Sequence, residues 1–63
     1  MVLMTIVDGE ERIYRDVDRR LFLNYVNGFL LMRNYARQGE MYQLIGKERR
    51  LLRKFGTMTT KYD

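Results

Sequence analysis

Few residue types in this 63-residue chain could do chemistry: carboxylates, tyrosines, lysines and threonines. The sequence contains no Cys, His, Ser, Pro or Trp. Thiolate and imidazole metal sites therefore cannot be built from it, and neither can a Ser-His-Asp or Cys-His arrangement. Asp16 and Asp18 stand at an expected helix start, where carboxylates serve as caps. We expect no enzymatic activity, no cofactor and no metal.

The strongest binding signal is the stretch 47–54, which holds five cations and one anion. Lys and Arg side chains on one surface neutralise phosphates and release counterions, which is how proteins bind nucleic acid. A nearby tyrosine could stack on a base or anchor a protein partner. The alternatives are an acidic protein surface, an anionic membrane surface, or a solvated face that keeps the protein soluble. The expected contact residues are Tyr42, Lys47, Arg49, Arg50, Arg53 and Lys54.

The net charge of +4 is unevenly distributed along the chain. Residues 1–18 carry two Arg against five carboxylates, for a net charge of −3, and residues 19–63 carry ten Lys or Arg against three carboxylates, for +7. Nine of the twelve cations are Arg, which suits bidentate contacts with phosphate or carboxylate. The acidic and basic parts could pair within an oligomer, or the basic part could face a partner.

The first expected element of the fold is a β-hairpin over residues 1–17. Asp8-Gly9 is a strong signal for a type I′ turn. It separates the β-rich segment 2–7 from the looser alternation of 10–17. Pairing across the turn places Val7 opposite Glu10 and, further along, Leu3 opposite Tyr14. An isolated hairpin is marginal in water, so this one must pack on helices or pair with another chain.

A long helix is expected over residues 17–38, capped by Asp16 or Asp18 and stopped by Gly39. Its broad apolar face forms the core. A second stripe on the opposite side indicates that the helix also packs against another chain. The expected oligomer interface is Leu23, Val26, Leu30 and Arg33.

A second, basic amphipathic helix is expected over residues 40–55, ended by Gly56. Its apolar face includes Met41, Leu44 and Leu52, and its other face is basic. Glu48 projects into the apolar face, where it is either solvated at a partly open edge or buried in an ion pair with Arg33 or Arg37 of the same or another chain.

Two internal glycines leave the boundaries of both helices open. Gly28, which follows Asn27, and Gly46 each cost about 1 kcal/mol relative to Ala inside a helix. If both break the chain, the region becomes three or four short helices. The tail 57–63 is expected to be disordered, with a third strand beside the hairpin as the alternative.

The predicted fold is therefore a single α+β domain over 1–63, mainly helical, with an N-terminal β-hairpin followed by an antiparallel two-helix hairpin. Chains this short rarely stabilise themselves without disulfides or metals, so we expect a homo-oligomer. The longest apolar run in the expected helix is four residues, far below the ~20 of a membrane span, so we expect a cytoplasmic protein and no membrane partner. The leading functional hypothesis is a regulator, inhibitor or adaptor that binds an unidentified protein. The alternative is a nucleic-acid-binding regulator that uses the Arg-rich face.

Overall fold

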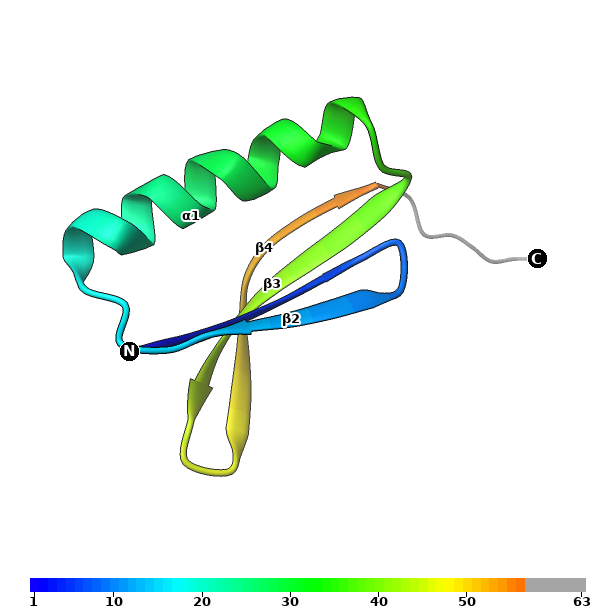
Figure 1. Cartoon of the computed structure of the whole chain (residues 1–63). Coiled ribbons are helices and arrows are strands. Elements are labelled where there is room, and N and C mark those ends of the chain that lie inside the picture. The colour runs from blue at the N-terminus through cyan, green and yellow to red at the C-terminus, as the bar shows by residue number, and fades with distance from the viewer. Residues whose placement is uncertain (57–63) are drawn as a thin grey trace.

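The computed structural model describes residues 1–56 and contains one four-stranded sheet with a single helical segment on one of its faces (Figure 1). The strands are β1 (Val2–Val7), β2 (Glu10–Tyr14), β3 (Gln38–Ile45) and β4 (Glu48–Gly56), in the spatial order β2-β1-β3-β4. All neighbouring strands are antiparallel. Helix α1 (Arg19–Leu31) continues into the 3-10 turn η1 (Met32–Asn34) and connects β2 to β3.

The N-terminal hairpin has the register that the Asp8-Gly9 turn predicts. Leu3 lies opposite Tyr14 and Val7 lies opposite Glu10. Both central turn residues have positive φ, as a type I′ turn requires. The Asp8 carboxylate also accepts hydrogen bonds from two backbone amides just before and at the start of β3, at 3.0 and 3.1 Å. The same turn therefore closes β2 onto β1 and fixes where β3 begins.

Helix α1 begins directly after Asp18, one of the two predicted N-caps, but it is shorter than expected. The Asp18 carboxylate accepts a hydrogen bond from the Leu21 amide at 2.8 Å, which makes Asp18 the N-cap. Gly28 lies inside α1 and does not break it. The regular helix ends at Leu31 instead of continuing to residue 38, and residues 38–45 form a strand.

The predicted two-helix hairpin is wrong, and the protein is not mainly helical. Residues 40–55 lie in β3, a turn and β4, an antiparallel ribbon. Gly46 sits in the turn with φ +59, a conformation that favours glycine. Gly56, expected to stop a helix, ends β4 with φ +91.

A register shift explains why the hydrophobic pattern of this ribbon resembles that of an amphipathic helix. Met41 pairs with Arg53 and the next residue, Tyr42, pairs with Leu51, so Leu52 is the extra residue of a β-bulge. Because the bulge breaks the strict alternation of β4, two adjacent positions of this strand, Leu51 and Leu52, are both apolar. Adjacent apolar residues are a feature of amphipathic helices and not of half-buried strands.

The core lies between α1 and one face of the sheet. Its fully buried members come from both layers: Leu3 and Met41 from the sheet, Val26 and Phe29 from α1, and Val17 from the connection between β2 and α1. The Phe29 and Phe55 rings pack with their centroids 5.0 Å apart. Figure 1 shows no helix on the opposite face of the sheet among residues 1–56.

No helix in the part of the chain that the structure describes is long and apolar enough to cross a membrane. The tail 57–63, for which disorder or a third strand was expected, lies outside the described residues.

Candidate functional site

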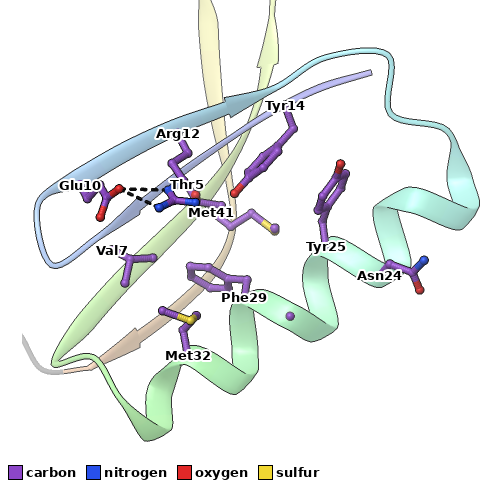
Figure 2. Close-up of a pocket in the computed structure, with 11 residues that line it drawn as sticks. Thr5, Val7, Glu10, Arg12, Tyr14, Asn24, Tyr25, Phe29, Met32 and Met41 are labelled. Atoms are coloured by element: carbon purple, nitrogen blue, oxygen red, sulfur yellow. Dashed lines mark hydrogen bonds and ion pairs between the residues drawn. The ribbon is translucent and has the colours of Figure 1, made fainter.

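A cavity of about 290 Å³ lies between α1 and the hairpin strands β1 and β2 (Figure 2). The stacked Tyr14 and Tyr25 rings, 4.5 Å apart between centroids, line it together with Phe29. The Thr5 side chain also lines it, although Thr5 is only 6% exposed. Its remaining lining is Val7, Glu10, Arg12, Asn24, Gly28, Met32 and Met41.

Apolar and aromatic side chains make up most of the lining of this cavity. The hydrogen bonds among its lining side chains within residues 1–56 join Arg12 to Glu10, at 2.9 and 3.1 Å. Both members of that ion pair are mostly exposed. Within the same range, no cluster of three or more acidic residues could hold a metal ion. Among residues 1–56, no hydrogen bond joins a hydroxyl group of the lining to the Glu10 carboxylate.

The basic residues predicted to bind a partner gather on the β3–β4 ribbon. The exposed cations are Lys47 in the turn and Arg49, Arg50, Arg53 and Lys54 in β4. The ion pair that the structure shows within residues 1–56 is Arg12–Glu10, in the other hairpin, so none of these five cations is in an ion pair with a described carboxylate. Their charge therefore remains available to a polyanion.

The cations point to both sides of the ribbon because successive strand residues alternate between faces. Arg50 pairs with Gln43 and Arg53 with Met41, which places these two on the helix side of the sheet. Lys54 pairs with Glu40 and so lies on the opposite, open face. The end of the ribbon extends past the last residue pair of β1, Val2 with Leu44, and lies apart from α1 in Figure 1.

Tyr42, predicted as a contact residue, lies on the open face beside Arg49. The Arg49 guanidinium carbon is 4.7 Å from the centre of the Tyr42 ring, a cation–π contact. The Tyr42 hydroxyl donates a hydrogen bond to the Glu40 carboxylate at 3.0 Å. Partial burial raises the pKa of Tyr42, and Glu40 adds to this effect while the Arg49 charge opposes it. Tyr42 therefore holds Arg49 in place as a neutral ring.

A tyrosinate absorbance titration tests this arrangement. Ordinary tyrosine titrates near pH 10. We expect the folded protein to show a component above that range and Tyr42→Phe to lack it, because the hydroxyl that Glu40 holds neutral is gone. The raised pKa means that the folded state retains a proton that the unfolded state loses. This stabilising contribution is therefore present below pH ~10 and is lost as the pH rises through the folded-state pKa. If Tyr42→Phe keeps the late component, another tyrosine is the one that titrates late and the raised pKa of Tyr42 is contradicted.

The predicted oligomer stripe is not a continuous surface. Val26 is buried in the core of its own chain, and Leu30 packs against that core. Leu23 is 55% exposed, and Arg33 is exposed in η1. Val26 and Leu30 therefore face the sheet of their own chain, together with Phe22, Tyr25 and Phe29.

Glu48 is exposed at the start of β4, directly after the turn. It pairs in register with Ile45 and has no ion pair with a described residue, including Arg33 and Arg37. The buried ion pair considered for this carboxylate is therefore absent from residues 1–56.

The cavity is not predicted by the periodicity or the motifs of the sequence. The hairpin register places Thr5 opposite Arg12 and Leu3 opposite Tyr14, so it already puts these side chains on one face. The missing information was where α1 would cross that face, which depends on packing between distant segments.

Searches of protein-family models, curated proteins and solved structures each found no match to this chain.

Proposed function

We propose that this chain is a non-enzymatic regulator that binds nucleic acid through the basic β3–β4 ribbon. One observation carries the proposal: five exposed cations lie on a single two-stranded ribbon and have no ion pair with any residue in the range 1–56. A cytoplasmic location is part of the proposal.

The shape of this element favours nucleic acid over the protein partner that led the sequence-based hypotheses. The major groove of B-form DNA is about 12 Å wide and admits a two-stranded ribbon. Cations on both sides of such a ribbon could approach the phosphates on both sides of the groove. A protein partner was expected to meet the Arg-rich face together with any exposed remainder of the apolar stripe, but Val26 and Leu30 of that stripe pack into or against the core of their own chain.

Arg is the residue type that this role needs. Three of the five ribbon cations are arginines, which bind phosphate or guanine edges with two hydrogen bonds. The Tyr42 ring under Arg49 restricts one of them, so less side-chain entropy is lost on binding. Arg12 is in an ion pair with Glu10 and is not counted as a contact residue.

Binding of a fluorescently labelled DNA duplex across a salt series tests the proposal. Each phosphate contact contributes a slope of about −0.9 to log K against log salt, so five contacts give about −4.5. We expect tight binding at low salt that weakens steeply as salt is added. A labelled single strand should bind more weakly, because it lacks the groove. Absence of duplex binding at low salt would exclude the proposal and leave an acidic protein surface as the partner of this ribbon.

A further inference from the structure

The face of the sheet that α1 leaves open carries a continuous band of apolar side chains. The strand registers place Ile13, Met4, Tyr42 and Leu51 side by side across all four strands. Ile13 and Leu51, at the two edges, are 47% and 49% exposed, whereas Met4 between them is 4% exposed and Tyr42 is half-buried, with the Arg49 guanidinium over its ring. None of the four packs against the core cluster between the sheet and α1. A two-layer fold with an apolar face on its second side is incomplete until that face is covered.

The neighbouring row on the same face carries charges of opposite sign at its two ends. Glu11 lies at the β2 edge, Ile6 and Glu40 follow on the inner strands, and Lys54 lies at the β4 edge. In this row the face thus has an acidic edge and a basic edge, with Ile6 and the Glu40 carboxylate between them.

From this arrangement we infer that the open face binds a second copy of the same chain, sheet against sheet, about a two-fold axis that runs along the strands. Such an axis places the β2 edge of one copy over the β4 edge of the other. Glu11 then faces Lys54 of the second copy, and Ile13 faces Leu51 of the second copy. An axis that runs across the strands would instead place each edge strand over its own copy, so Lys54 would meet the β4 edge of the second copy, whose charged residues on this face, Arg49 and Lys54, are both cations.

The sheet edges are less suited to self-association than this face. Both outer strands carry charged side chains on each of their sides: Glu10, Glu11 and Arg12 in β2, and Arg49 to Lys54 around two leucines in β4. Charged edge strands resist pairing with another chain. The apolar band is therefore the surface on which contact with a second copy is most favourable.

The size of the face sets the expected strength of the dimer. Four strands about 4.8 Å apart and about six residues long give a face of roughly 19 by 20 Å. Stacking two such faces covers roughly 800 Å² in plan, which is below the ~1,200–2,000 Å² of stable specific interfaces and in the range of weak, transient ones. We therefore expect a dissociation constant in the micromolar range and a mass that depends on concentration.

Sedimentation equilibrium on the full chain, from about 1 to a few hundred micromolar, tests the inference. The expected mass rises from 7.7 kDa towards twice that value. Ile13→Asp should remain monomeric throughout, because it would bury an unpaired charge between the sheets. Leu23→Asp places the same charge on the exposed surface of α1 and should leave the dimer unchanged.

A pair of charge reversals tests the orientation. Glu11→Lys should weaken the dimer about tenfold, because it would face Lys54 of the second copy. Glu10→Lys makes the same change on the next residue, which lies on the helix side of the sheet, and should have little effect. Adding Lys54→Glu to Glu11→Lys should restore part of the lost affinity. A circular dichroism spectrum of each variant shows that it is folded.

A wild-type mass of 7.7 kDa at every concentration would overturn the inference. A Leu23→Asp variant that dissociates as readily as Ile13→Asp would also overturn it and place the interface on α1. Equal effects of Glu10→Lys and Glu11→Lys would exclude the proposed axis. Arg50 and Arg53 lie on the helix side of the sheet, which the dimer leaves uncovered, whereas Lys54 lies on the open face that the second copy would cover. The sedimentation test itself contains no nucleic acid, so its outcome does not depend on the proposed function.

Discussion

Replacing Phe29 by alanine is expected to leave most of the protein unfolded at room temperature. Phe29 is 4% exposed and packs against Phe55, so it joins the single helix to the far strand of the sheet. Truncating a buried phenylalanine costs about 3–5 kcal/mol. A chain of this size rarely gains more than ~3–5 kcal/mol from its own core. The substitution therefore removes as much stability as the fold can be expected to have.

Thermal unfolding followed by circular dichroism measures this effect. The matched control is Leu31→Ala, a truncation in the same helix at a side chain that is 62% exposed. It should change the unfolding free energy by only a few tenths of a kcal/mol, as surface substitutions usually do. If both variants unfold at the wild-type temperature, α1 does not pack on the sheet through Phe29.

The second large effect is expected at Gly39, which is buried in β3. A Cβ atom added there would lie 2.5 Å from the Phe55 ring and 3.1 Å from the Phe29 ring. Neither ring can move away without disturbing the contact between them. Gly39→Ala should therefore destabilise the protein by about 1–3 kcal/mol, the usual cost of overpacking a core.

Gly28 provides the matched comparison, because the same substitution there meets no atom within 4 Å. It lies inside α1, where alanine is favoured over glycine by about 1 kcal/mol. Gly28→Ala should thus raise the midpoint of urea unfolding while Gly39→Ala lowers it. Shifts of the same sign in both variants would contradict the close contact of Gly39 with the two phenylalanines.

The N-terminal part of the fold could be predicted because its signals are local. Asp8-Gly9 determines the turn type, and the turn determines the register, including the pairing of Leu3 with Tyr14. Asp18 caps α1 through an amide three residues away. Each of these features depends on residues close in sequence.

The C-terminal half could not be predicted by periodicity, because the β-bulge at Leu52 makes β4 resemble an amphipathic helix. One signal did point to the ribbon. On the basic face of the predicted helix, no packing contact would require a glycine at position 46. In the structure Gly46 occupies the turn with positive φ. A glycine without a helical role, between two segments rich in apolar residues, predicts a hairpin.

The candidate binding residues were found more readily than the element that carries them. Lys47 and Arg49 are exposed in the ribbon as they would have been on a helix, because charged side chains remain in water in either structure. Whether a given apolar residue is buried or exposed, by contrast, depends on the fold. Val26, expected on an outer stripe, is 6% exposed in the core, while Ile13 and Leu51 lie on the open sheet face.

Contact between the ribbon cations and phosphates is the central element of the proposed function. The most direct measurement compares two charge-matched variants in duplex binding across a salt series. Arg50→Ala with Arg53→Ala removes two ribbon cations, whereas Arg19→Ala with Arg20→Ala removes two exposed cations from the first turn of α1. We predict that the ribbon variant binds more weakly and has a salt slope shallower by about 2, while the helix variant keeps the wild-type slope. Equal slopes in the two variants would contradict the proposal that this ribbon is the nucleic-acid interface.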